Sequence, residues 1–266
     1  MVSPGQGLET RGDDFGFDPQ FTERIKGIAL WVYRNYFRVE VDGIRNVPAS
    51  GPALLAANHA GVIPYDGAMI RTAIIAEHPR PRHARMLVVD WAFALPYASM
   101  LLTKTGNVLA HPDNAATLLE RGELVGVFPE GVKGAAKHYR NRYRVQRLGR
   151  GGFVQVALRT GAPIVPVAVV GAEEVHPVIF EARPLARFFG LPTAPVTPTF
   201  PWLGPLGLVP LPSKWFIAFG KPIQVSHFGP DAAENPRVVL ELSEHVREWI
   251  QSTLGQLLPR RRTIFF

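Results

Sequence analysis

The chain contains no cysteine among its 266 residues. This absence excludes a thiol nucleophile, an acyl-cysteine intermediate and any disulfide, and it is typical of a reducing compartment. The first 17 residues are polar and lack a basic segment followed by an apolar one, so we expect no secretory signal. These features favour a protein that works on the cytoplasmic side of the membrane.

Charge is missing from one long segment, Phe188 to Ser213. Its length would suit a transmembrane helix, but its prolines exclude a regular helix, and an irregular backbone cannot be exposed in the bilayer core. We interpret the segment as an apolar loop that either covers an acyl-chain tunnel or rests at a membrane surface. The alternative is an insertion that packs on the core. The prolines are Pro192, Pro195, Pro198, Pro201, Pro205, Pro210 and Pro212.

Positive charge is in excess, since 29 lysines and arginines face 22 acidic residues and leave a formal net charge of +7. Such a balance favours an anionic partner: nucleic acid, phospholipid head groups or a phosphorylated substrate. The stretch from Lys137 to Arg150 is especially basic. No nucleic-acid-binding motif accompanies it, so we expect an anionic membrane surface and no nucleic acid.

Apolar strand patterns alternate with helical ones along most of the chain. This alternation predicts an α/β fold: one domain with a mostly parallel central sheet flanked by helices. We expect strands at 39–41, 53–56, 86–89, 124–128, 163–170 and 215–219, and helices at 68–76, 91–102, 112–121, 151–159 and 238–258.

The predicted domain spans residues 19–258 and begins with an amphipathic helix over 19–37, whose mixed aromatic and basic residues suit either a membrane interface or packing on the core. Residues 1–18 are predicted to be a flexible arm. Residues 259–266 form a basic and aromatic tail, which suits anionic lipid or is frayed in solvent.

Two turns carry the candidate chemistry. The strand at 53–56 leads into a turn that holds His59, and the next helix begins near Asp66, which we expect to be its N-cap. A carboxylate can accept a hydrogen bond from one ring nitrogen of a histidine, which raises the basicity of the other nitrogen. The second turn follows the strand at 124–128 and carries Glu130 and Lys133.

Together, Asn58-His59 with Asp66 and the run Phe128-Pro129-Glu130-Gly131 resemble the motifs of the glycerophospholipid acyltransferase family. The resemblance extends from about Phe37 to Ile223. Members of the family commonly have four residues between the histidine and the aspartate, whereas six lie between them here. The turn from Gly61 to Gly67, with a proline before the aspartate, resembles a subgroup of the same superfamily.

The resemblance implies a glycerolphosphate-acyltransferase-like fold and an O-acyltransferase similar to 1-acylglycerol-3-phosphate acyltransferases. Thioesters are already activated, so no covalent acyl-enzyme is needed, and the sequence has no Gly-x-Ser-x-Gly elbow. The implied roles are a general base for His59, its orientation for Asp66, contacts with the substrate for Asn58, Glu130 and Gly131, and contacts with an acceptor phosphate for Lys133, with Lys137 and Arg140 as further candidates.

The expected donor is acyl-CoA or acyl carrier protein, with no cofactor, and the expected acceptor is lysophosphatidic acid or glycerol phosphate in phospholipid synthesis. The remaining histidines are scattered without a second ligand nearby, so we expect no metal. In the family's middle motif an arginine follows a glycine, but here Ala110 follows Gly106.

This departure leaves another lysophospholipid or a neutral monoacylglycerol open as the acceptor. A basic membrane- or nucleic-acid-binding protein without activity is the non-enzymatic alternative. For the enzyme, we expect peripheral, monotopic binding at the cytoplasmic face of a membrane.

Overall fold

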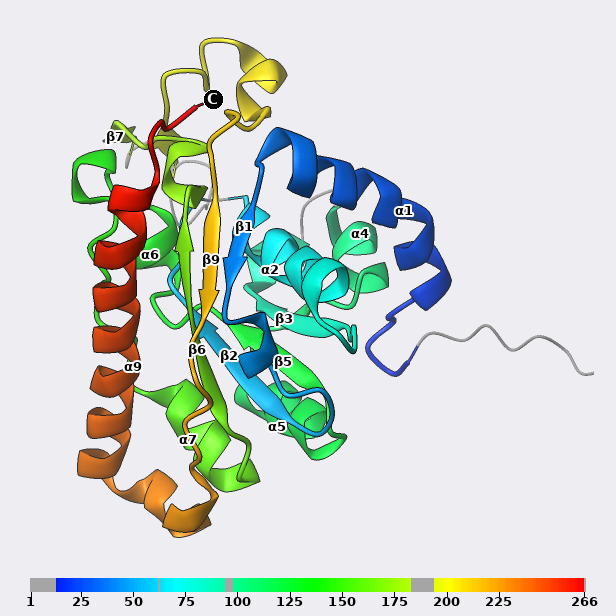
Figure 1. Cartoon of the computed structure of the whole chain (residues 1–266), viewed down its shortest axis with the longest axis vertical. Helices are drawn as coiled ribbons and strands as arrows, with labels where there is room; N and C mark the ends of the chain where they lie inside the picture. The colour runs from blue at the N-terminus through cyan, green and yellow to red at the C-terminus, as the bar shows by residue number, and fades with distance from the viewer. Residues whose placement is uncertain (1–12, 62, 94–97, 183–193, 266) are drawn as a thin grey trace, which may run out of the picture.

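A seven-stranded sheet forms the centre of the computed structural model, which describes residues 13–61, 63–93, 98–182 and 194–265 (Figure 1). The strand order is β1-β9-β6-β2-β5-β3-β4. The five strands from β6 to β4 are parallel, whereas β9 is antiparallel to β6 and parallel to β1. The mostly parallel sheet predicted from the sequence is therefore confirmed. The strands are β1 (Glu40–Asp42), β2 (Ala53–Ala57), β3 (Ala84–Val88), β4 (Val108–Leu109), β5 (Leu124–Val127), β6 (Ile164–Val170) and β9 (Phe216–Phe219).

Helices cover both faces of this sheet, because successive side chains of its buried strands point in opposite directions. Leu54 and Ala56 of β2 pack into one core cluster, while Ala53, Leu55 and Ala57 pack into another. The first cluster includes α5 (Pro112–Glu120), α7 (Gly152–Thr160) and α9 (Pro236–Leu257), and the second includes α2 (Tyr65–Glu77). Figure 1 shows α9 along β6 on one side and α2 with α1 (Pro19–Trp31) on the other.

The smaller elements lie at the ends of the strands and in the connections. Apart from the helices expected at 19–37 and 91–102, each expected strand and helix is present, with ends within three residues of the predicted ones. The helix over 19–37 is α-helical to Trp31 and continues as a π-helix to Tyr36. Of the helix expected at 91–102, the structure describes a part that ends at Phe93 and a part that begins at Ala98; residues 94–97, with Pro96 among them, lie outside the described residues. The two-residue strand β4 was not predicted. The smaller elements are the π-helix η1 (Val32–Tyr36), α3 (Asp90–Phe93), α4 (Ala98–Lys104), α6 (Val132–Ala135), the 3-10 helix η4 (Ala172–Glu174) and the antiparallel pair β7 (Phe180–Glu181) and β8 (Pro195–Val196).

The prediction of a flexible arm is wrong for residues 13–18, which pack on the domain; residues 1–12 lie outside the described residues. Asp13 forms an ion pair with the buried Arg85. The guanidinium of Arg85 also lies 5.8 Å and 5.1 Å from the ring centroids of Phe15 and Phe17. Residues 13–18 therefore pack around Arg85, whose buried charge is shared between Asp13 and Glu123, the latter 2.9 Å away.

The C-terminal tail is also attached to the domain, so its interpretation as a frayed segment is wrong. Arg260 pairs with Asp42, and Arg261 Nη2 lies 2.7 Å from an oxygen of the buried Glu174. The carbonyl of Ile264 accepts a hydrogen bond of 2.8 Å from the amide of Lys214. Two of the three consecutive arginines thus form internal ion pairs.

The described part of the uncharged loop, residues 194–213, exposes its apolar side chains. Trp202 and Leu206 are each 72% exposed, so this part is not an insertion that packs on the core. The loop is attached through its backbone, since the hydroxyl of Tyr36 donates to the carbonyl of Pro210 and the side chain of Arg38 donates to that of Pro212 at 2.9 Å. Among the described residues, no helix is long and apolar enough to cross a membrane.

Candidate active site

His59 and Asp66 meet at the carboxyl end of β2, where the strand passes into α2. The two side chains are joined by a hydrogen bond of 2.6 Å between Nδ1 and Oδ2. The carboxylate is 0% exposed and accepts two further bonds, from the amide of Ala60 at 3.0 Å and from that of Gly67 at 2.8 Å. The longer spacing between the two residues is therefore compatible with a direct contact.

The expectation that Asp66 caps α2 is wrong. Pro64 occupies the N-cap position, where no side chain caps the helix, and Asp66 lies within the first turn. Its carboxylate turns back toward the preceding loop because the donors there, His59 and the amide of Ala60, converge on one oxygen. A carboxylate in the first helical turn is still favoured by the helix dipole.

The ring of His59 is held on a second side by Phe128. The two rings stack with centroids 4.4 Å apart and planes inclined by 24°. The imidazole is 15% exposed, and its Nε2 makes no hydrogen bond to any residue within the described ranges. Nε2 is therefore the atom that can accept a proton from a bound molecule.

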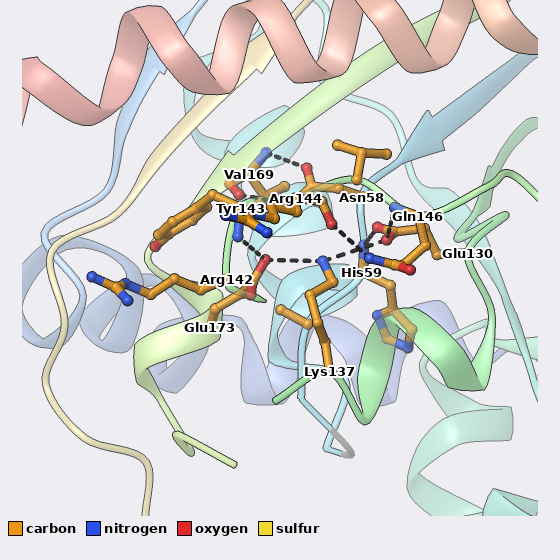
Figure 2. A network of polar contacts seen from close by, with 12 residues as sticks. Asn58, His59, Glu130, Lys137, Arg142, Tyr143, Arg144, Gln146, Val169 and Glu173 are labelled. Carbon is orange, nitrogen blue, oxygen red and sulfur yellow. Dashed lines mark hydrogen bonds and ion pairs between the residues drawn. The ribbon is translucent and has the colours of Figure 1, made fainter. Parts of the chain in front are cut away.

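Glu130 joins the His59 turn to two other segments (Figure 2). Its Oε1 accepts from the backbone amide of His59 at 3.0 Å, and its Oε2 accepts from the amide of Gln146 at 2.7 Å. A Cβ added to Gly134 would lie 2.6 Å from that of Glu130 and 3.3 Å from that of His59. Glycine is thus needed where α6 packs directly against the two residues.

The three cations proposed for phosphate binding have different environments. The first of them, Lys133, lies on the surface just after Gly131. Gly131 itself precedes α6 with φ 59° and ψ −150°, a conformation that is essentially restricted to glycine. Lys133 and Arg140 are exposed, and neither forms an ion pair with the residues that the structure describes. Lys137 is only 5% exposed and lies between Glu130 and Glu173, with its Nζ 3.4 Å and 3.2 Å from their carboxylates.

The side chain of Asn58 is enclosed by the protein and bonds to the backbone. It is buried, its Nδ2 donates to the carbonyl of Val169 at 3.0 Å, and its Oδ1 accepts from the amide of Val169 at 2.7 Å. These bonds extend the pairing of β2 with β6 by one residue. The geometry assigns Asn58 to holding the chain just before His59, with its amide directed at β6 instead of toward a substrate.

Glu173 was not identified from the sequence, although it borders the site. It follows the central strand β6, and its Oε1 accepts from the backbone amide of Tyr143 at 2.9 Å. Burial raises the pKa of its carboxyl to about 7, against the opposing effect of Lys137. Two adjacent acidic residues, Glu173 and Glu174, directly after the most apolar strand were the signal that could have identified it. Gln146 carries no such signal, because it contributes only its backbone amide.

Comparison with known proteins agrees with this geometry. The model of the acyltransferase family matches residues 38–170. The chain belongs to the acyltransferase family. An uncharacterized protein of Mycobacterium tuberculosis is 51% identical over 255 residues, which cover 96% of this chain and 71% of that protein. The "DGAT1/2-independent enzyme synthesizing storage lipids" of Bos taurus is 30% identical over 128 residues, or 48% of this chain and 37% of the relative.

The fold matches that of a solved acyltransferase. The crystal structure of the 1-acyl-sn-glycerophosphate acyltransferase PlsC from Thermotoga maritima superposes with a TM-score of 0.61 at 17% identity, covering 91% of this chain and 81% of that one. The family match thus confirms the prediction of an acyltransferase, and the solved structure confirms the predicted glycerolphosphate-acyltransferase-like fold.

Proposed function

We propose that this acyltransferase moves a fatty acyl group from acyl-CoA, or from acyl carrier protein, to a hydroxyl of lysophosphatidic acid or glycerol phosphate in phospholipid synthesis. The observation that supports it best is the pairing of His59 with Asp66, which leaves Nε2 directed away from its partner. The exposed Lys133, just beyond the Glu130 turn, supplies a cation for the acceptor phosphate.

In the proposed reaction, Nε2 of His59 takes the proton of the acceptor hydroxyl as its oxygen attacks the thioester carbonyl carbon. A carbon–oxygen bond forms, the carbon–sulfur bond breaks, and the departing thiolate takes the proton back from the imidazolium. The products are an ester and a free thiol. Asp66 keeps a proton on Nδ1 and stabilises the imidazolium. Backbone amides of the two glycine-containing turns are the proposed donors to the oxyanion.

For the acceptor, we assign the phosphate to Lys133 and Arg140, whose charges lie at the surface. The carboxylate of Glu130 is buried and already accepts two backbone hydrogen bonds. Its turn would therefore contact the glycerol part through the backbone of Gly131, while Glu130 itself holds the turn in shape.

A neutral monoacylglycerol or another lysophospholipid is the second candidate acceptor. Ala110, where an arginine was expected, is exposed and offers no charge to a phosphate. The bovine relative is described as an enzyme synthesizing storage lipids. Both observations favour including monoacylglycerol, an acceptor without a phosphate, in the test.

The decisive experiment measures release of CoA thiol by the purified protein from palmitoyl-CoA. The acceptors are lysophosphatidic acid, glycerol 3-phosphate, lysophosphatidylcholine and monoacylglycerol, and palmitoyl carrier protein is tested as a second donor. We expect the highest turnover with lysophosphatidic acid or glycerol 3-phosphate. Equal or faster turnover with monoacylglycerol would instead assign the protein to neutral-lipid acylation, and no turnover with any acceptor would refute both.

We also propose that the protein binds the cytoplasmic face of a membrane peripherally, with its active site toward the lipid. Ile28 and Trp31 of α1 are exposed, as are Trp202 and Leu206 of the loop at the top of Figure 1. The two surfaces adjoin, because the ring of Trp31 lies 6.3 Å from that of Tyr36, which donates to the loop. Exposed apolar groups on a protein of net positive charge suit an anionic bilayer.

The loop also borders the site, since the hydroxyl of Tyr65, next to Asp66, donates to the carbonyl of Leu208 at 3.5 Å. Flotation with vesicles that contain anionic lipid tests the proposal: we expect binding that salt weakens and that the double change Trp202→Ser with Leu206→Ser reduces. An absence of binding at low salt, or binding that the double change leaves intact, would count against this surface.

A further inference from the structure

Three charged side chains form a buried cluster at the carboxyl ends of the central strands, next to the site: Glu130, Lys137 and Glu173 (Figure 2). Their side chains are 0%, 5% and 6% exposed. The ammonium of Lys137 lies between the two carboxylates, 3.4 Å from Oε2 of Glu130 and 3.2 Å from Oε1 of Glu173. A lysine so enclosed is rare unless its charge is paired.

The topology of the sheet explains why this cluster affects His59. In the sheet, β2 lies between β5 and β6, and all three run parallel, so their carboxyl ends meet at one edge. His59 follows β2, Glu130 follows β5, and Glu173 follows β6. Lys137 therefore connects the turns on both sides of the strand that delivers the catalytic base.

Backbone donors complete the arrangement. Glu130 accepts from the amides of His59 and Gln146, and Glu173 accepts from the amide of Tyr143. Bonds to backbone amides strengthen when the acceptor is ionised. Removing the ammonium would leave two carboxylates near each other without their cation, an arrangement that buried sites do not tolerate.

We infer that Lys137 is a positioning residue of the acyl transfer: its ammonium holds the Glu130 carboxylate in place, so that Oε1 of Glu130 fixes the backbone of His59. Lys137 is thus distinct from Lys133, which contacts the acceptor. The inference rests on the proposed function for its kinetic consequences, but its structural consequence, a looser His59 backbone, is independent of the substrate.

The test compares Lys137→Met with Arg150→Met, which removes an exposed cation that forms no ion pair with the described residues. For Lys137→Met we expect kcat to fall about ten- to hundredfold, since small displacements of a catalytic group have effects of this size. The KM values for acceptor and donor should change little, and Arg150→Met should retain both kcat and KM.

A second readout needs no substrate. Hydrogen exchange at the amides of His59 and Gln146 should accelerate in Lys137→Met and remain at the wild-type rate in Arg150→Met, because both amides donate to Glu130. If Lys137→Met does not fold, the double change Lys137→Met with Glu173→Gln removes the second buried carboxylate as well, and it is expected to fold with the same slow turnover and fast exchange.

Three outcomes would overturn the inference. A rise in the acceptor KM at constant kcat would make Lys137 a substrate ligand, unchanged kinetics would remove it from the site, and unchanged exchange at His59 would show that it does not act through Glu130. If the wild-type protein transfers no acyl group at all, the proposed function fails, and the exchange measurement alone decides the role of Lys137.

Discussion

Two buried charge arrangements meet at His59, and they differ in how the chain builds them. Asp66 bonds to the imidazole from seven residues along the same turn. Glu130 bonds to the backbone of His59 from 71 residues away, and it depends on Lys137 and Glu173 for its environment. The first arrangement sets the chemistry of the ring and the second sets its position, so the two should fail in different ways.

The largest effect is expected when the ring itself is removed. His59→Ala should lower kcat by about 10²–10⁴, because the general base is lost. The fold should remain, since the side chain lies on a turn and the amide that donates to Glu130 is unchanged. CoA release and circular dichroism of the variant measure the two effects. Near-normal turnover would disprove the mechanism.

Asp66→Asn changes the same pair more gently. The amide can donate to Nδ1, which would leave the proton on Nε2, the wrong tautomer for a base. We expect a lower kcat with unchanged KM values and with normal hydrogen exchange at the His59 amide. Faster exchange at that amide would mean that the two arrangements are coupled.

Arg261→Met tests a buried ion pair beside the second arrangement, since its partner Glu174 directly follows Glu173. The guanidinium donates to both oxygens of the buried Glu174, at 2.7 Å and 3.1 Å. The change removes the closest cation of Glu174 and leaves only Arg142, whose Nε lies 3.9 Å from the carboxylate, so the free energy of unfolding should fall by about 3 kcal/mol. Urea denaturation measures it, and Arg262→Met, which changes an exposed residue, should cost less than about 0.5 kcal/mol. Equal stability of the two variants would contradict the role assigned to the tail.

Glu173→Gln examines how pH acts on the second arrangement. Burial raises the pKa of the Glu173 carboxyl to about 7 from an ordinary value of 4.5; Lys137 and the amide of Tyr143 lower it, and Glu130 raises it. Between about pH 4.5 and 7 the folded protein thus holds a proton that the unfolded chain has released, so the contribution of Glu173 to stability is lost as the pH rises.

Relative to Glu173→Gln, the free energy of unfolding of the wild-type protein should therefore decrease by on the order of 1–3 kcal/mol over this window. Urea denaturation at several pH values measures the difference. A difference that stays constant with pH, or that grows as the pH rises, would show that the pKa is not raised.

The smallest effect is expected for Lys133→Ala, at the exposed lysine four residues before the buried Lys137. We expect the apparent KM for lysophosphatidic acid or glycerol 3-phosphate to rise about tenfold, which corresponds to about 1.4 kcal/mol. The KM for palmitoyl-CoA should change little, and Lys133→Arg should be tolerated, because a lysine acts as a point charge. Equal changes for both substrates would make Lys133 a general surface residue.

Sequence reasoning succeeded where the interacting groups are close along the chain. The alternation of strands and helices, the turn that joins His59 to Asp66 and the Glu130 turn all arise from patterns within about ten residues. It did not show that Lys137, predicted as a phosphate ligand together with Lys133 and Arg140, lies between two buried carboxylates. Charge alone cannot distinguish these three residues, because burial depends on which strands become neighbours.

The same difference, between groups close along the chain and contacts between distant segments, applies to the ends of the chain and to the acid–base site. The proposed chemistry follows from the residue types at His59 and Asp66, and the apolar runs specify the sheet through side-chain periodicity. The strand order β6-β2-β5 then brings Glu173, Lys137 and Glu130 together, and it places Glu174 where Arg261 can reach it. Those contacts require burial across distant segments, and only the packed molecule provides the low-polarity surroundings in which each charge needs its partner.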